Sequence, residues 1–470
     1  MYYLHPNRLF PSDEVSNSIS NELYKEVQDL PIISPHGHTD PQWFSENQPF
    51  SDPAALFLTP DHYVLRLLFS HGISYDQLGV PRKDGKSVVD GRTAWRLFAK
   101  NYYIFEGTPS KLWIDHSLHF EFGIDIPLNA ITADTIYDRI KEKLSSPDML
   151  PRTILDRANV EVIATTEYAL DSLIYHQKMY KDGLIGRIRT TYRPDDVNDP
   201  EHTGNPDNIL RLGEITHENV TNWKGLINAH RKRRETFRKF GAVATDHGVP
   251  SAMTADLSMI EKQKLLDLVL KGLIDTTGAE MFRAQMLTEM ALLSIEDGMV
   301  MQIHAGAQRN TDPQLKIERG ANLGADIPRT IDCVNGLRAL LERCGNEPNL
   351  RIIMFVLDET TYARELAPMA GYWRCLMIGP PWWFHDSPHG IRRYLDQVVE
   401  TAGFYNLAGF NDDTRALLSI RARHDTWRRE VCGFLARWVC EHRISKQSAF
   451  EIAKYLSYKA AKDSYRIDRV

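Results

Sequence analysis

Short apolar runs alternate with helix-like stretches along most of this chain, and this alternation constrains the fold more than any other feature. The eight runs lie at residues 31–35, 160–166, 186–192, 241–247, 298–304, 350–357, 374–379 and 405–410. Near-continuous apolar strands separated by helices are typical of a parallel sheet covered on both faces, and eight such units close into a barrel. The sequence therefore predicts an α/β fold, a (β/α)8 TIM barrel built as a single domain over residues 1–470.

The segment 41–155 interrupts this pattern directly after the first run. It contains helix-like patches broken by proline and glycine, and it shows no repeated strand signal. Barrels of this kind keep their chemistry at the carboxyl ends of the strands, which is where this segment begins. We therefore expect 41–155 to be a mostly helical insertion after the first strand that caps the active site.

Composition narrows the class of protein. The 470 residues are 43% hydrophobic and 25% charged, and the net charge of -6 gives no reason to expect a nucleic-acid partner. The basic run Arg231–Arg234 is interpreted as a solvated helix face. The stretch Met1–Ser18 has no apolar region behind a basic start, and no run reaches the length of a membrane span, so we expect a cytoplasmic protein without a membrane partner.

The five cysteines are an odd number and include no Cys-x-x-Cys pair. This spacing favours neither a disulfide framework nor a zinc ribbon, so reduced thiols are expected.

Two histidines separated by one residue, His36 and His38, follow the first apolar run. In an extended segment, side chains two residues apart point the same way, so both imidazoles can bind one metal ion. Ordinary surface or capping histidines are the alternative interpretation of such a pair. The other strand ends are also rich in metal ligands and ion-pairing groups, namely Thr166, Glu167, Arg193, Asp246, His247, His304 and Asn411–Arg415.

Several short motifs around these positions resemble the amidohydrolase superfamily and, within it, the uronate isomerase (glucuronate isomerase) family. The superfamily pattern is His-x-His after strand one, His304 after strand five and Asp413 after strand eight. The motifs that resemble the family are Asp61-His62-Tyr63, Tyr192–Asp195, Asp246-His247, Gln302–Asn310, Gly379–Phe384, Asp413-Thr414-Arg415, Arg423-His424 and Trp427–Arg429. Their order and number, spread over nearly the whole chain, make the resemblance specific.

The resemblance implies an aldose-ketose isomerase. Such an enzyme interconverts D-glucuronate with D-fructuronate, and D-galacturonate with D-tagaturonate, by moving a proton from C2 to C1 in hexuronate catabolism. It also implies one divalent cation, zinc with manganese or iron as other possibilities, held by His36, His38 and Asp413. A homo-oligomer that takes a small hexuronate substrate is expected.

The resemblance further implies the roles of individual side chains. Asp413, acting with the C5 hydroxyl, starts proton transfer; Tyr63 bonds the C1 carbonyl oxygen; and Arg415 contacts the C2 and C3 hydroxyls. His62 completes the catalytic group. The substrate-binding residues are expected to be Arg193, Trp382, His304 and Asp246.

Three other functions remain open from the sequence. One is a metal-dependent amidohydrolase or lactonase of the same superfamily, and another is a non-catalytic barrel that binds sugar acids. A third is a nucleotide-binding protein, because Gly79–Ser87 resembles a phosphate-binding loop. That loop has five residues between its glycines where four are needed, and no predicted strand precedes it.

Overall fold

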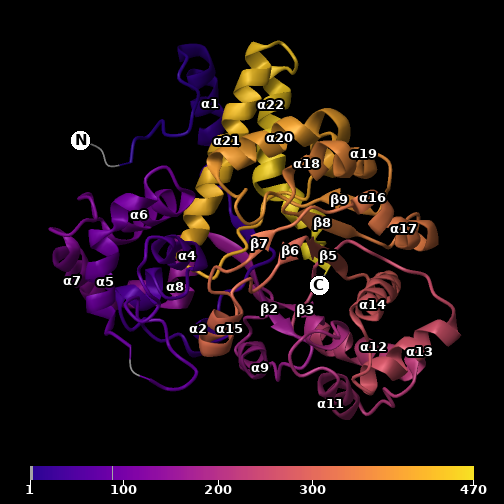
Figure 1. The fold of residues 1–470 in the computed structure, drawn as a ribbon. Coiled ribbons are helices and arrows are strands. Elements are labelled where there is room, and N and C mark those ends of the chain that lie inside the picture. Colours follow the sequence, from indigo (N-terminus) through magenta and orange to yellow (C-terminus); the bar gives the residue numbers. More distant parts are fainter. Residues whose placement is uncertain (1–3, 87, 470) are drawn as a thin grey trace.

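Seven parallel strands form one curved sheet at the centre of the molecule (Figure 1). The computed structural model describes residues 4–86 and 88–469. Every neighbouring pair in the sheet is parallel, and every residue of the strands Val300–Ala305 and Ile352–Val356 is buried, as a sheet covered on both faces requires. The strands, in sheet order, are β1 Ile32–Ser34, β2 Val160–Tyr168, β3 Ile188–Arg193, β4 Ala244–Val249, β5 Val300–Ala305, β8 Ile352–Val356 and β9 Leu376–Ile378. Seven of the eight predicted strands are thus confirmed.

The eighth predicted strand, 405–410, is reduced to a single parallel bridge between Leu407 and Ile378. Gly409 has a φ of +80°, and a Cβ there would lie 2.6 Å from the backbone nitrogen of Ala461. The C-terminal helix therefore passes against the chain where a regular strand would continue. This bridge nevertheless lies in the eighth position of the barrel, beside β9.

Helices cover the outside of the sheet (Figure 1). Those that follow β2 to β4 are α9 Ile174–Lys181, α10 Asp195–Asn198, α11 Asp207–Thr216, α12 Trp223–Lys239, α13 Met259–Leu270 and α14 Thr276–Asp297. After β5 comes a two-stranded hairpin, β6 Ala307–Gln308 and β7 Ile327–Pro328, which encloses α15 Pro313–Arg319. The remaining α-helices of the barrel are α16 Cys333–Gly336, α17 Arg338–Cys344, α18 Glu359–Thr361, α19 Ala367–Ala370, α20 Pro388–Ala402, α21 Ser419–Cys440, α22 Lys446–Lys454 and α23 Ala460–Ser464. The N-terminal helix α1, Glu14–Val27, packs beside α21 and α22.

In the described residues of the segment 41–155, all regular structure is helical. Its α-helices are α2 Pro41–Glu46, α3 Pro53–Phe57, α4 His62–Ser70, α5 Gly91–Lys100, α6 Pro109–Phe122, α7 Ala133–Leu144 and α8 Pro151–Arg157, and two short 3₁₀ helices, η1 Tyr102–Phe105 and η2 Pro147–Met149, lie between them. They bury a hydrophobic cluster that includes Phe44, Trp95 and Phe98. Within the described part of this segment, the loop 79–86 follows α4 and a turn, with no strand before it; Ser87 lies outside the described residues. The phosphate-loop alternative therefore lacks its structural context.

The basic run on α12 is a solvated face only in part: Arg231 and Lys232 are exposed as predicted, but the second half of the run is not. Arg233 and Arg234 are buried, and the Arg234 guanidinium donates to the Asp297 carboxylate at 2.7 Å. An arginine is buried at this helix interface because a neighbouring helix supplies its counter-charge.

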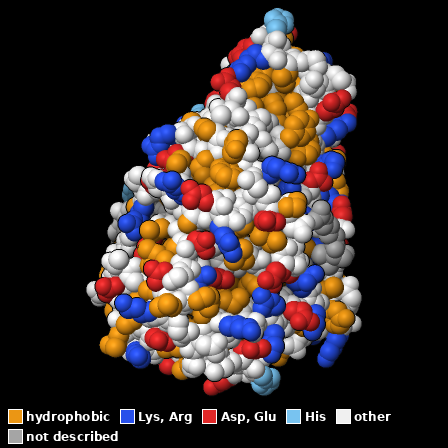
Figure 2. Space-filling model, turned by 90° about the vertical axis from the view of Figure 1, so that its right-hand side faces the viewer, with side chains coloured by type: hydrophobic (Ala, Val, Ile, Leu, Met, Phe, Trp, Pro, Cys, Tyr) orange, Lys and Arg blue, Asp and Glu red, His pale blue; other side chains and the backbone are white. Residues whose placement is uncertain are grey.

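The surface carries charges of both signs. Figure 2 shows basic and acidic side chains interspersed over the face that it draws. Among the described residues, no helix is long and apolar enough to cross a membrane.

The inside of the barrel is filled by side chains from the strands and from the C-terminal segment. Ile33, Val162, Val300 and Ile353 belong to one buried cluster, and Tyr465, which directly follows α23, is part of it. The C-terminal segment therefore reaches the barrel interior and contacts residues that support the site described next.

Candidate active site

A cavity of about 760 Å³ opens at the carboxyl ends of the strands. Nine of the ten side chains predicted from the sequence line it: His36, His38, His62, Arg193, Asp246, His304, Trp382, Asp413 and Arg415. The tenth, Tyr63, is not part of the lining. The fold therefore brings together residues that lie far apart in the sequence.

His36, His38 and Asp413 meet at one side of this cavity. The Oδ1 atom of Asp413 lies 3.6 Å from Nε2 of His36 and 3.3 Å from Nε2 of His38. The two imidazole rings are 5.2 Å apart and nearly perpendicular. A hydrogen bond from the His38 N–H to the Thr414 carbonyl, at 2.9 Å, joins the two segments that carry these side chains.

Asp413 has a φ of +37°, in the left-handed region that non-glycine residues rarely adopt. Such backbone conformations persist where the surrounding structure holds them, and they are frequent at functional sites. Here the conformation aims the carboxylate at the two histidines.

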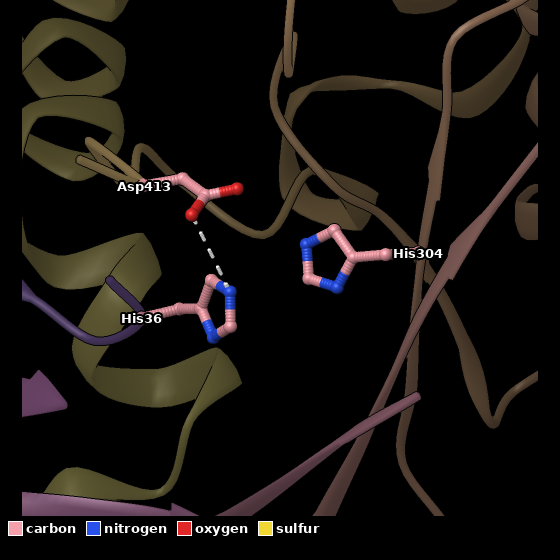
Figure 3. A group of neighbouring side chains, drawn as sticks. All are labelled: His36, His304 and Asp413. Carbon is pink, nitrogen blue, oxygen red and sulfur yellow. Dashed lines mark ion pairs between the residues drawn. The ribbon is translucent and has the colours of Figure 1, made fainter. Parts of the chain in front are cut away.

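His304, on β5, faces the same space from the opposite side (Figure 3). One ligand atom from each of His36, His304 and Asp413 lies within 4.8 Å of the others, so this trio could hold a metal ion. The Nδ1 atom of His304 is 2.7 Å from Asp246 Oδ1. Because an ionised carboxylate only accepts, Nδ1 carries the proton and Nε2 keeps its lone pair. That Nε2 atom is buried and has no hydrogen-bond partner among the described residues.

The imidazoles of the pair are held neutral. Burial lowers the pKa of His36, although Asp413 opposes this effect, and burial together with the nearby Arg415 charge lowers the pKa of His38 well below its usual value. Neutral imidazole and carboxylate are the forms that bind divalent metals. The donor set of His36, His38 and Asp413 thus fits a single bound cation, and the unpaired Nε2 of His304 faces the same space.

Arg193, at the end of β3, is clamped by two carboxylates. Its guanidinium donates to Asp195 Oδ2 at 2.7 Å and to Asp246 Oδ2 at 2.9 Å. Burial disfavours the Asp246 carboxylate, but Arg193 and His304 outweigh that effect and hold the pKa of Asp246 well below its usual value. Arg193 is therefore a fixed positive charge at the cavity wall.

Gly248, on β4, has no side chain and so leaves the space that the Arg193 guanidinium occupies. A Cβ at this position would overlap Nη2 of Arg193 and lie 2.8 Å from Oδ2 of Asp195. We expect Gly248→Ala to displace the guanidinium and to weaken binding of an anionic substrate about 10-fold, since charged hydrogen bonds contribute about 1.5–3 kcal/mol. Steady-state kinetics would show this as a raised KM. An unchanged KM would mean that Arg193 does not hold the substrate.

His62 and Tyr63 begin α4, which Asp61 caps by accepting hydrogen bonds from the backbone N–H groups of Tyr63 and Val64. The His62 ring lines the cavity, its Nε2 atom is buried and has no hydrogen-bond partner in the part of the chain that the structure describes, and burial lowers its pKa to about 3. The Tyr63 hydroxyl instead donates to Asp386 at 3.0 Å, and Asp386 also accepts from Arg423 at 2.6 Å. In this structure Tyr63 is thus engaged beside the cavity rather than in its wall.

Aromatic rings and arginines form the rest of the wall. The Trp382 ring meets His304 edge-on at 4.7 Å and stacks on Trp383 at 5.1 Å. The guanidinium of Arg309 lies over Trp383 at 5.1 Å, and burial lowers the pKa of both Arg309 and Arg415. Because the guanidinium groups stay charged, this wall favours an anionic ligand.

Sequence reasoning missed the roles of Gln302, Arg309 and Asp386. Gln302 is two residues before His304 on β5, so the period of a strand could have placed it on the same face. Arg309 lies within the motif Gln302–Asn310, and its positive charge could have indicated a role in binding an anion. Asp386 had no signal, because only the folded chain brings it to Tyr63.

Glu167, at the end of β2, points away from the cavity. It is buried, accepts a hydrogen bond from the Thr190 hydroxyl, and lies 3.7 Å from the His176 ring nitrogen. Burial raises the pKa of Glu167 to about 8.

A pH-dependent effect on stability follows from Glu167. The pKa of Glu167 is raised in the folded state. Its contribution to the free energy of unfolding is therefore complete below the ordinary pKa near 4.5 and is lost as the pH rises through about 8. The stability of the wild type relative to Glu167→Gln should therefore fall by about 1 kcal/mol for each pH unit across that window. Urea unfolding at pH 5 and pH 8 measures the difference; equal differences at both values would contradict the raised pKa.

Comparisons with known proteins agree with this site. The family model described as glucuronate isomerase matches residues 12–465. A uronate isomerase from Phenylobacterium zucineum (strain HLK1) is 52% identical over 99% of this chain and 97% of its own length. The crystal structure of glucuronate isomerase from Caulobacter crescentus superposes with a TM-score of 0.97 at 49% identity, covering 99% of this chain and 98% of that one. The uronate isomerase from Thermotoga maritima gives 0.91 at 28% identity, covering 98% and 99%.

The barrel and its His/Asp cluster define an amidohydrolase-type enzyme fold, as predicted. Within that class, the chain belongs to the glucuronate isomerase family.

Proposed function

We propose that this protein interconverts D-glucuronate with D-fructuronate, and D-galacturonate with D-tagaturonate, as an aldose-ketose isomerase of hexuronate catabolism. Membership of the glucuronate isomerase family over the whole chain supports the reaction. The observation that carries the proposal is the cavity itself, where Arg193 and Arg415 face a group of possible metal ligands. Such a wall suits a small sugar acid.

One divalent cation, zinc by its preference for imidazole and carboxylate, would be held by His36, His38 and Asp413. When bound, it would supply Lewis-acid charge that anchors the sugar carboxylate and a neighbouring hydroxyl. Two short distances from Asp413 to the histidines, 3.6 and 3.3 Å, support this set.

The side chains divide the chemistry among them. An α-hydroxy C–H is a weak acid, so its removal needs a base and stabilisation of the enediolate. We assign Asp413 to start proton transfer and Arg415 to bind the C2 and C3 hydroxyls. Arg193, held by Asp246, attracts the carboxylate, and Nε2 of His304 accepts a hydrogen bond from a sugar hydroxyl.

The other end of the sugar would lie against α4 and Trp382. His62 presents Nε2 to the cavity, whereas Tyr63 must exchange Asp386 for the C1 oxygen of the substrate. We propose that the insertion 41–155 caps the site, because it supplies His62 to the wall.

We also propose that the protein acts in the cytoplasm as a homo-oligomer. None of the five cysteines is paired in the structure, which suits a reducing compartment. Two large apolar side chains at the start of α13, Met259 and Ile260, are exposed by 59% and 83%, and an interface would cover them.

The test is NMR spectroscopy of the zinc-loaded protein in D₂O with glucuronate and with galacturonate. A ketouronate product with proton transfer or exchange at C1 is expected. Release of acid or ammonia from lactones or amides, without ketouronate, would favour the hydrolase instead. Binding of the uronates without any turnover would favour the non-catalytic barrel.

A further inference from the structure

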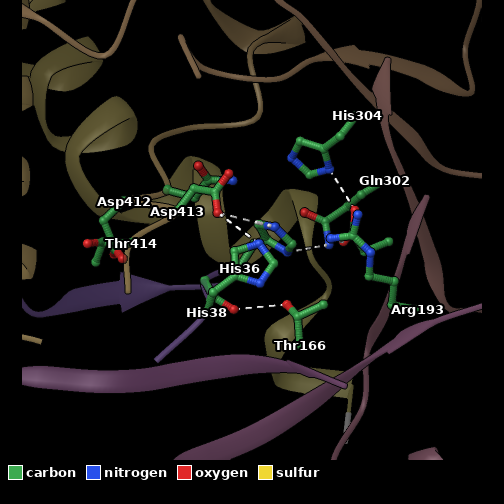
Figure 4. Close-up of polar contacts among 12 residues, drawn as sticks. His36, His38, Thr166, Arg193, Gln302, His304, Asp412, Asp413 and Thr414 are labelled. Carbon is green, nitrogen blue, oxygen red and sulfur yellow. Dashed lines mark hydrogen bonds and ion pairs between the residues drawn. The ribbon is translucent and has the colours of Figure 1, made fainter. Parts of the chain in front are cut away.

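A buried glutamine contacts one of the proposed metal ligands. Gln302 is fully buried on β5, and its Nε2 atom lies 3.3 Å from Nδ1 of His36 and 3.3 Å from the Thr245 carbonyl oxygen. Figure 4 shows His36 between Asp413 on one side and Gln302 on the other.

Gln302 is itself held by the C-terminal segment. Its Oε1 atom accepts a hydrogen bond from the Tyr465 hydroxyl at 2.8 Å, and the same hydroxyl accepts from Asn411 at 3.3 Å. A chain of hydrogen bonds thus runs from Asn411 through Tyr465 and Gln302 to His36. Every member of this chain is buried.

In this chain of hydrogen bonds Gln302 is the donor to His36, and that arrangement conflicts with metal binding by His36. A neutral imidazole carries one proton, so a donor at Nδ1 of His36 places that proton on Nε2. Nε2 is the atom that faces Asp413, and it can bind a cation only through a free lone pair. His304 has no such conflict, because the Asp246 carboxylate keeps its proton on Nδ1.

We propose that Gln302 is a positioning residue whose carboxamide turns over when the cation binds, so that Oε1 accepts the Nδ1–H of His36. Tyr465 allows this reversal, because a hydroxyl both donates and accepts: it would then accept from the Gln302 amide and donate to the Asn411 carboxamide, which turns in the same way. The turned amide would give up its long contact with the Thr245 carbonyl. This inference rests on the proposed metal site, and it makes Tyr465 and Gln302 a link between the C-terminal segment and the tautomer of His36.

Variants at position 302 test the proposal by zinc affinity, measured on the full chain by competition with a chromophoric chelator. Gln302→Leu removes the acceptor and should weaken zinc binding about 10–100-fold, the usual cost of losing a supporting partner of a ligand. Gln302→Glu keeps an acceptor and should bind zinc at least as tightly as the wild type. The control Gln285→Leu removes another fully buried amide, on α14, and should leave zinc affinity unchanged even if stability falls.

The ¹⁵N NMR spectrum of the histidine rings reports the tautomer directly, with His36 assigned by comparison with His36→Gln. We expect Nε2–H in the metal-free wild type, and Nδ1–H in the zinc-loaded wild type and in metal-free Gln302→Glu. A His36 tautomer that zinc does not change, or wild-type zinc affinity in Gln302→Leu, would overturn this inference. If zinc left the His36 resonances entirely unaffected, the proposed metal site would fail as well.

Discussion

Replacing Asp413 with asparagine is expected to lower kcat for glucuronate isomerisation about 1,000-fold, the usual scale for loss of a general base. An amide has no basic oxygen with which to start the proton transfer, but asparagine has nearly the same shape as aspartate. Asparagine also tolerates the left-handed backbone that Asp413 adopts, with its φ of +37°, so the loop should keep its conformation. Steady-state assays of ketouronate formation measure the loss.

Metal content separates the two roles of Asp413. The carboxamide oxygen can still bind a cation, so part of the zinc should remain in the Asp413→Asn protein when metal is measured by mass spectrometry. Wild-type turnover in this variant would remove Asp413 from the proton transfer. Complete loss of zinc would assign its effect to metal binding alone.

Replacing Arg193 with methionine is expected to destabilise the fold by about 3–5 kcal/mol, because it leaves buried carboxylates without their counter-charge. Asp195 and Asp246 both lose a donor, at 2.7 and 2.9 Å in the wild type. Asp246 would then also hold His304 less firmly. Denaturant unfolding measures the stability, and the KM for glucuronate should rise in the protein that remains folded.

A surface arginine provides the matched comparison. Arg338 is 70% exposed and pairs with Glu342 one helical turn away, so Arg338→Met should change the stability by no more than about 0.5 kcal/mol. If the Arg193→Met and Arg338→Met proteins were equally stable, the buried ion pairs of Arg193 would contribute nothing to the fold.

The strands were the most predictable part of the fold, because apolar runs such as 298–304 and 350–357 are buried on both faces. The sequence predicted a full strand at 405–410, where the structure has a single bridge. The close approach of the C-terminal helix to Gly409 prevents the strand, and no local sequence pattern indicates that approach. Helix α6, Pro109–Phe122, is the part of the insertion that the sequence indicates least clearly. It buries Asp115, His116 and Glu121 together with apolar side chains, so the sequence lacks a clear apolar stripe there.

The candidate metal ligands and the charged residues of the cavity were predictable because they follow strand ends, where a barrel gathers its chemistry. Arg193, Asp246 and His304 are examples that converge as expected. The hydrogen-bond partners of the site residues were harder to predict from the sequence. The contact of Tyr63 with Asp386 joins residues more than three hundred positions apart, and no sequence period relates them.

The central claim is that one cation binds between His36, His38 and Asp413. Its most direct test is a crystal of the zinc-loaded protein, measured on both sides of the zinc absorption edge. We predict one anomalous peak about 2.0–2.2 Å from an imidazole nitrogen of each histidine and from an Asp413 oxygen. A fully loaded protein whose only peak lies away from these three side chains would contradict the account.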